Sequence, residues 1–224
     1  MGLTLHDQSS DHDDPVVLVI DDDPDVRDGL RSLFESVDLQ SRSFGSAQEF
    51  LRSQIPDQVS CLILDVRLPG LSGIDFQTNV QIDIPIIFIT GHGDIPMSVK
   101  AMKAGAVEFL TKPFREQELL DAVRIALDRD RERRHRKATR HDLRSHFDLL
   151  SAREREVMTL VTAGMMNKQV AAELGISEVT VKVHRHNLMK KLDANAFTDL
   201  VRMADALGLP SHDYDERTWE RARQ

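Results

Sequence analysis

The chain has 224 residues, which suits one large domain or two small ones, and an apolar content of 41% is sufficient to bury a core. The sequence contains no run of 18 or more apolar residues, which argues against a membrane span. The acidic N-terminus lacks the basic and apolar regions of a secretory signal. The single cysteine, Cys61, lies within an apolar run, which indicates a small buried side chain rather than a redox role.

The net charge of −8 is unevenly distributed along the chain. Residues 1–127 carry 10 basic against 21 acidic side chains, whereas residues 128–144 carry 8 against 4. An acidic first half, a basic joint and a second half of balanced charge predict two domains. The negative charge of the whole chain therefore does not exclude nucleic-acid binding by the second half.

The first half alternates short apolar runs with amphipathic segments. Helices are predicted from Pro24, from Ser46, over about 94–104 and from about Arg115. Alternating strands and helices predict a parallel sheet that is covered on both faces. Five strands are predicted, at Val16–Ile20, Gln40–Phe44, Cys61–Leu64, Ile86–Ile89 and Val107–Leu110.

Polar side chains follow four of these strands: Asp21 and Asp22, then Asp65, Thr90 and Lys112. Because the carboxyl ends of parallel strands share one edge of a sheet, we expect these groups to meet. Three carboxylates and one ammonium leave a formal charge of about −2, which is costly unless it is compensated. A hard divalent cation compensates it, and oxygen ligands that leave waters in place suit Mg²⁺. A carboxylate such as that of Asp65 can accept a phosphoryl group as a nucleophile.

The order of these motifs over residues 16–130 resembles the receiver domain of two-component response regulators: DD, then D followed by LPGLSG, then T, then KP. The stretch IIFITGHGDIPMSVKAMKAGAVEFLTKPF is similar to FixJ-type receivers. The resemblance implies a flavodoxin/CheY-like fold in which a sensor histidine kinase phosphorylates Asp65. It implies that Mg²⁺ is bound by Asp22, Asp65 and the backbone carbonyl of Arg67, with Asp21 acting mainly through water.

The same resemblance implies that Thr90 and Lys112 contact the phosphoryl oxygens and that Phe109 is the switch aromatic. Their movement would remodel the face formed by the fourth helix, fifth strand and fifth helix of the receiver. A hydrolase resembling the haloacid-dehalogenase family would also use an Asp nucleophile and Mg²⁺. Such enzymes carry a second Asp two residues later, where this chain has Arg67. A receiver that works without phosphorylation is a further alternative.

From Phe147 onward, the pattern predicts helices alone. A capping box at Ser151 starts one helix. A short helix is predicted over 167–174 and, after a turn at Gly175, a longer one over 178–192. Two helices joined by a tight turn that contains glycine predict a helix-turn-helix.

The long helix is predicted to have two distinct faces. At about 100° per residue, one buried stripe comprises Val181, His184, Leu188 and Leu192. The opposite face is polar and largely basic, which suits a DNA major groove, and is predicted to comprise Glu178, Lys182, Arg185, His186 and Met189.

Most of residues 148–206, through LSAREREVMTLVTAGMMNKQVAAELGISEVTVKVHRHNLMKKLDA, resembles the LuxR-type DNA-binding domain of the FixJ/NarL family. The resemblance implies an all-α domain of four helices that dimerises through its last helix. The positions that read base edges in this family are here Lys182, Val183 and His186. Candidates for contacts with the DNA backbone are Lys168, Thr180, Arg185 and Lys190.

Together, the two resemblances imply a bacterial, cytoplasmic transcription factor rather than an enzyme. The receiver would catalyse only its own phosphotransfer and dephosphorylation. Phosphorylation would promote homodimerisation and promoter binding, with RNA polymerase as a further candidate partner. The predicted segments are a flexible leader (1–14), the receiver (15–130), a charged linker that continues the last receiver helix (131–146), the LuxR-type domain (147–207) and a tail (208–224).

Overall fold

In a computed structural model of the protein, residues 14–80, 82–91, 93 and 95–209 are described. The chain divides into two compact units, residues 1–134 and 135–224. The predicted leader up to residue 13 and the tail from residue 210 lie outside the described residues. No helix in the described part of the chain is both long and apolar enough to cross a membrane.

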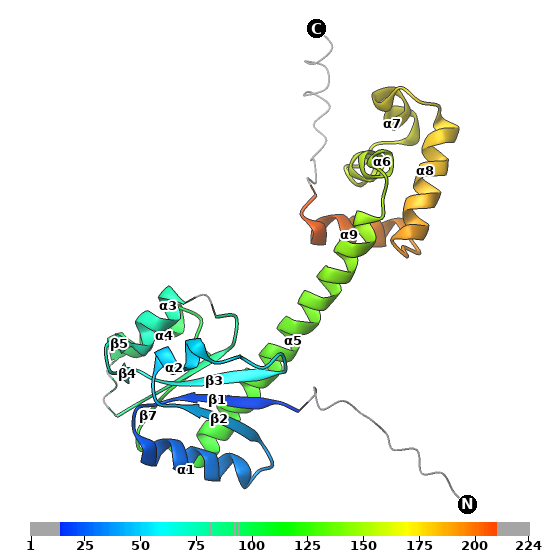
Figure 1. The fold of residues 1–224 in the computed structure, drawn as a ribbon. Coiled ribbons are helices and arrows are strands. Elements are labelled where there is room, and N and C mark those ends of the chain that lie inside the picture. Colours follow the sequence, from blue (N-terminus) through cyan, green and yellow to red (C-terminus); the bar gives the residue numbers. More distant parts are fainter. Residues whose placement is uncertain (1–13, 81, 92, 94, 210–224) are drawn as a thin grey trace, which may run out of the picture. The chain divides into compact units, whose positions relative to one another are not determined.

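The first unit is built on a five-stranded sheet in which every neighbouring pair of strands is parallel (Figure 1). The order is β2-β1-β3-β6-β7, the doubly wound order in which ligands bind beside the central strands at their carboxyl ends. The predicted five-stranded parallel sheet is therefore confirmed. Its strands are β1 (Val16–Ile20), β2 (Gln40–Phe44), β3 (Ser60–Asp65), β6 (Ile86–Thr90) and β7 (Glu108–Thr111).

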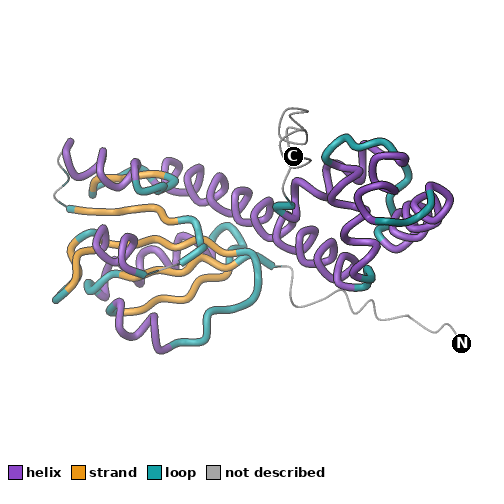
Figure 2. The backbone as a smooth tube through the Cα atoms, turned by 90° about the horizontal axis from the view of Figure 1, so that it is seen from above, coloured by secondary structure: helices purple, strands orange, loops and turns teal. Residues whose placement is uncertain are grey.

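Helices cover both faces of this sheet (Figures 1 and 2). On one face, α1 (Pro24–Glu35) and the start of α5 (Glu116–Asp148) bury Phe34 and Leu119 among alternate strand residues. On the other face lie α2 (Ala47–Arg52), α3 (Gly73–Asn79) and α4 (Ile95–Lys103). Because both faces are covered, the central strands are apolar throughout instead of alternating.

Three short elements between β3 and β6 differ from the prediction. Strands β4 (Arg67–Leu68) and β5 (Leu71–Ser72) form a small antiparallel hairpin, and helix α3 follows directly. Helix α3 escapes prediction because it has seven residues, no side-chain cap, and two buried apolar residues, Ile74 and Phe76, spaced as in a strand.

Helix α5 continues through the predicted linker to Asp148, and Asp130, just before that linker, is completely buried. The Asp130 carboxylate accepts a hydrogen bond from the Ser60 backbone amide at 3.0 Å and pairs with Arg133 (2.7 Å) and Arg134 (2.8 Å). Charge pairing therefore replaces apolar contact at this point of the helix.

The second unit contains α6 (Ala152–Thr162), α7 (Asn167–Leu174), α8 (Glu178–Lys191) and α9 (Phe197–Leu207), as predicted for an all-α domain of four helices (Figure 1). Ser151 and Glu154 form the predicted capping box, and Lys191 also contacts the buried Glu154 carboxylate at 2.7 Å. Gly175 ends α7 with φ = 64°, a left-handed conformation that favours glycine and turns the chain into α8.

Candidate functional sites

Three carboxylates meet at the carboxyl edge of the parallel sheet. Asp21 and Asp22 follow β1 directly, and Asp65 is the last residue of β3, the strand beside it. Carboxylate oxygens of the three residues lie within 4.8 Å of one another. Asp21 is fully buried and Asp65 is 7% exposed, whereas Asp22 faces solvent. The structure therefore brings together the three acidic residues that the sequence places at two strand ends.

Lys112 completes this cluster from the loop after β7. Its Nζ lies 2.6 Å from Oδ2 of Asp21 and 3.1 Å from Oδ2 of Asp65. Burial lowers the pKa of Lys112, but its hydrogen bonds to the two carboxylates outweigh burial and hold that pKa above its ordinary value. Burial also raises the pKa of Asp21, and the neighbouring ammonium opposes only part of this shift. Lys112 thus stays charged at neutral pH and offsets part of the repulsion among the carboxylates.

The carboxylates are held in fixed orientations by backbone amides. Oδ1 of Asp65 accepts a hydrogen bond from the Arg67 amide at 2.9 Å, and Oδ1 of Asp21 accepts one from the Asp23 amide at 3.0 Å. An all-oxygen donor set with one exposed member, Asp22, fits a hard cation that keeps some of its water, such as Mg²⁺. That the Arg67 carbonyl is a ligand stays a prediction.

Thr90 and Phe109 lie on the neighbouring strands β6 and β7. Thr90 is completely buried, and Phe109 packs partly buried against the apolar cluster beneath α2, α3 and α4. These two side chains border Gly93, where a larger residue would be crowded. A Cβ atom on Gly93 would lie 2.7 Å from Cγ2 of Thr111, 3.0 Å from the Phe109 ring and 3.3 Å from Cγ2 of Thr90. Glycine therefore lets the loop after β6 pass close to these side chains of β6 and β7.

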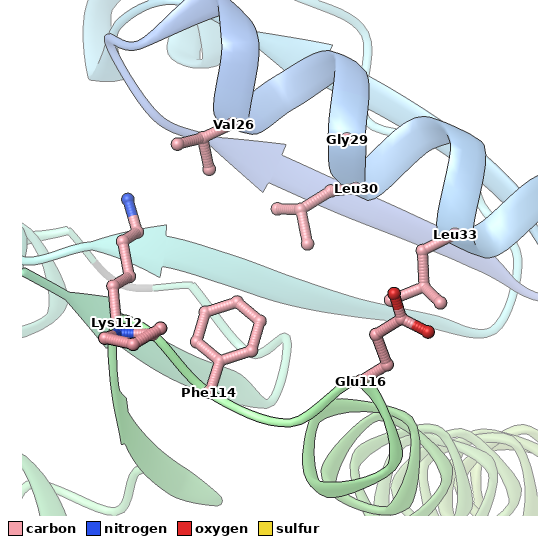
Figure 3. A pocket seen from close by; sticks show the side chains of 8 residues that line it. Val26, Gly29, Leu30, Leu33, Lys112, Phe114 and Glu116 are labelled. Carbon is pink, nitrogen blue, oxygen red and sulfur yellow. The ribbon is translucent and has the colours of Figure 1, made fainter.

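A groove of about 330 Å³ lies beside Lys112 (Figure 3). Val26, Leu30 and Leu33 of α1 form one wall, and Phe114 faces them from the loop before α5. The sequence does not reveal this groove, because α1 and that loop are distant in the chain and become neighbours only through the sheet order. The lining is completed by Gly29, Pro113 and Glu116.

In the second unit, helix α8 has a buried stripe and an exposed face. Val181, Leu188 and Leu192 are buried, and His184 is partly buried, in agreement with the predicted stripe. Of the predicted DNA contacts, Thr180 is partly buried beside the helix cap Ser177. Exposed positions among the predicted contacts are Lys168 on α7 and Lys182, Val183, His186 and Lys190 on α8.

Two residues predicted on the exposed face do not lie there. Arg185 donates a hydrogen bond to Oδ1 of Asn167 at 2.7 Å, and its guanidinium lies 5.4 Å from the centre of the Phe197 ring. Met189 packs against the core of the second unit. With Lys182 at zero on a helical wheel, the buried stripe is centred at about 245°, so the exposed face is centred at about 65° and not at zero. Arg185 and Met189 flank the buried stripe instead.

Two families of known proteins match separate parts of the chain. Residues 17–124 match the response regulator receiver domain, and residues 148–204 match the bacterial regulatory proteins of the luxR family. These ranges contain the acidic site and the helix-turn-helix, respectively.

Relatives match along most of the chain. It is 57% identical over 206 residues to nodulation protein W of Bradyrhizobium diazoefficiens, covering 91% of this chain and 90% of that protein. It is 40% identical over 200 residues to the transcriptional regulatory protein FixJ of Azorhizobium caulinodans, covering 88% and 95%. The solved structure of response regulator StyR is similar with a TM-score of 0.73 and 51% identity, covering 86% of this chain and 98% of that one. The chain belongs to the FixJ/NarL family of two-component response regulators, which join a receiver domain to a LuxR-type DNA-binding domain.

Proposed function

We propose that a sensor histidine kinase switches this transcriptional regulator by Mg²⁺-dependent phosphorylation of Asp65. The observation that supports this proposal is the geometry around the Asp65 carboxylate. Asp65 lies at the end of β3, its Oδ1 is oriented by a backbone amide, and its Oδ2 lies 3.1 Å from the ammonium of Lys112. A positioned carboxylate beside a cation suits nucleophilic attack on phosphorus, because most of the catalysis of phosphoryl transfer is positioning and charge stabilisation.

In the proposed transfer, an oxygen of Asp65 attacks the phosphorus of the kinase's phosphohistidine. The P–N bond breaks, its electron pair stays on the imidazole, and an acyl phosphate forms on Asp65. Lys112 and Thr90 would contact the added oxygens. When bound by Asp22, Asp65 and the Arg67 carbonyl, with Asp21 acting through water, Mg²⁺ would supply positive charge to those oxygens.

The phosphoryl donor would approach along the groove beside Lys112. Its lining combines an apolar wall from α1 with the ammonium of Lys112 at one end (Figure 3). Such a groove fits one face of an amphipathic helix, a common mode of protein recognition. We therefore place the helix of the kinase that carries the phosphohistidine on α1, within reach of Asp65.

The proposed output is formation of a homodimer through α4. Three large apolar side chains are exposed on this helix at i, i+4 and i+7: Ile95 (80%), Val99 (45%) and Met102 (43%). Exposed apolar side chains that line one stripe of a helix indicate a surface for a partner, whereas single scattered ones do not. The shift of Thr90 and Phe109 on phosphorylation would remodel the adjoining face, and a dimer would present two copies of α8 to two half-sites of promoter DNA.

In the proposed DNA complex, Lys182, Val183 and His186 contact base edges. Contacts with the DNA backbone come from Lys168, Thr180 and Lys190. Arg185 is left out of this proposed set, because its guanidinium contacts Asn167 and the Phe197 ring. RNA polymerase at the promoter is a further candidate partner, and these partners would place the protein in the bacterial cytoplasm.

The test is phosphorylation by a small donor such as acetyl phosphate with Mg²⁺, read as incorporated phosphoryl groups by intact-protein mass spectrometry. Asp65→Asn should incorporate none, whereas Asp75→Asn, a change at an exposed aspartate on α3, should behave as wild type. Equal incorporation in Asp65→Asn would refute the site. Beryllofluoride with Mg²⁺ should then promote dimerisation and DNA binding. An unchanged sedimentation coefficient and DNA affinity would favour a receiver that works without phosphorylation.

Arg67 argues against the alternative function of a phosphoaspartyl hydrolase. It occupies the position of the acid/base Asp of such enzymes, and it faces solvent. Its presence would leave the acyl phosphate without a carboxylate at the position from which those enzymes activate water, so the phosphorylated state would persist. Arg67→Asp should therefore lose its phosphoryl group faster than wild type, and equal rates would contradict this role of Arg67.

A further inference from the structure

Two valines lie on the exposed face of α8. Val179 is 69% exposed and Val183 is 51% exposed. They are spaced i, i+4, at about 60° and 100° on the wheel whose exposed face is centred at about 65°, so Val179 lies at the centre and Val183 beside it. Valine loses side-chain freedom in a helix, and an exposed valine regains little through burial. The packing of the second unit therefore gives no reason for this pair.

The surroundings of the pair match double-stranded DNA. His186 and Lys190 are exposed on the same side of the helix, with Lys190 at about 80° on the wheel, between the two valines, and Lys182 is exposed at its flank. Lysines and apolar side chains that share one face suit the major groove, where phosphates border the base edges and the thymine 5-methyl group is the apolar feature. Residues i and i+4 are about 6 Å apart along a helix, close to the distance between base pairs two steps apart.

We infer that Val179, together with Val183, selects the DNA sequence by contacting the 5-methyl groups of thymines. The inference rests on the proposed reading of DNA by α8 and extends it. The family resemblance assigns base reading to Val183 and its neighbours but not to Val179. The position of Val179 one turn earlier widens the apolar contact from one base pair to two.

The test uses the full chain activated by beryllofluoride and Mg²⁺. Preferred sites are selected from a library of random double-stranded DNA, and the enriched site is then synthesised with single thymines replaced by deoxyuridine. This replacement removes one methyl group and leaves base pairing intact. We expect a loss of about fourfold in affinity at each contacted thymine, the loss expected for exposing one buried methyl group.

The variant Val179→Ala separates the two valines. It should bind the selected site more weakly and should lose the uracil penalty at one thymine of each half-site while retaining it at the other. Alanine is the better helix former, so α8 should stay folded, and circular dichroism checks this. Val37→Ala removes another exposed valine, from the first unit (42%), and should retain both penalties.

Each remaining outcome has a defined meaning. If no sequence is enriched, sequence-specific DNA binding is refuted and the inference falls with it. If a site is enriched but uracil is tolerated at every thymine, the DNA-binding function stands and the inference is wrong. If Val179→Ala keeps both penalties, the methyl groups are read by other residues, and the role of Val179 is refuted.

Discussion

Replacing Asp130 with alanine is predicted to destabilise the first unit and leave the second unchanged. Asp130 lies on α5, yet its buried carboxylate accepts a hydrogen bond from the amide of Ser60, the first residue of β3. The same carboxylate pairs with Arg133 and Arg134 on the next turn of the helix. The Asp130 side chain therefore links helix α5 to strand β3 of the sheet.

The loss in the free energy of unfolding caused by Asp130→Ala can be worked out from these contacts. Alanine leaves the buried Ser60 amide without its acceptor, which costs about 1–3 kcal/mol. The lost ion pairs cost less than a fully buried pair, because the arginine side chains are 26% and 27% exposed and keep contacts with Asp83 (3.5 Å) and Asp57 (2.7 Å). We take about 1 kcal/mol for them, which gives a total of about 3 kcal/mol. Asparagine keeps an acceptor for the amide and should cost about 1 kcal/mol.

Scanning calorimetry of the full chain resolves this prediction, provided that the two units unfold in separate transitions. For a domain of this size, 1 kcal/mol lowers the midpoint by roughly 3–5 °C. The transition of the first unit should fall by about 10 °C in Asp130→Ala and by about 4 °C in Asp130→Asn. Asp128→Ala is the matched control, since Asp128 is exposed and pairs with Arg131 on the same helix at 2.7 Å. The reasoning would be wrong if the first transition were unchanged in Asp130→Ala. It would also be wrong if that transition fell equally in Asp130→Ala and Asp128→Ala.

Three further predictions concern the two sites. In Gly73→Ala, the new Cβ would lie 2.4 Å from the carbonyl oxygen of Asp65, so the backbone must shift and urea unfolding should show lower stability. Gly29→Ala, with open space in α1, should instead stabilise the protein by about 0.5–1 kcal/mol. Burial raises the pKa of Glu154, but hydrogen bonds from its lysine and backbone partners hold it below its ordinary value of 4.5. The stabilisation from the ionised carboxylate is therefore present above pH 4.5 and lost as pH falls through the lowered pKa, so Glu154→Gln should weaken the second unit in urea more at pH 7 than at pH 3. Arg185→Lys should lower DNA affinity without changing its salt dependence, whereas Lys190→Ala should reduce the slope of log K against log salt by about 1; equal slopes in both variants would argue against these roles.

Much of the acidic site is predictable from sequence because its residues follow apolar runs directly. A short, β-branched apolar run such as Val16–Ile20, followed by turn residues, predicts a buried strand, and its end fixes the position of Asp21 along the sheet edge. Parallel order then brings Asp65 beside it. The groove on α1 is not predictable in this way, because its two walls are joined only by the tertiary fold.

Asp130 shows a different limit of sequence reasoning. Alternating charges without apolar residues ordinarily indicate a solvated helix. Whether a carboxylate is buried depends on the donors that reach it, and here one donor is a backbone amide 70 residues away in the sequence. No local pattern records that partner, so the buried anchor of α5 is visible only in the structure.

In helix α8, the exposed face is identified by the positions of the buried residues and not by the positions of the charged ones. Charged residues occupy both the exposed centre and the flanks, since a long side chain at the flank can reach a partner on its own domain. Arg185 does so through Asn167 and Phe197, contacts that position α8 within the second unit. The direction opposite the buried stripe holds Val179 instead. The exposed centre of a helix is therefore located from its buried residues, and polarity alone would have favoured Arg185 over Val179 there.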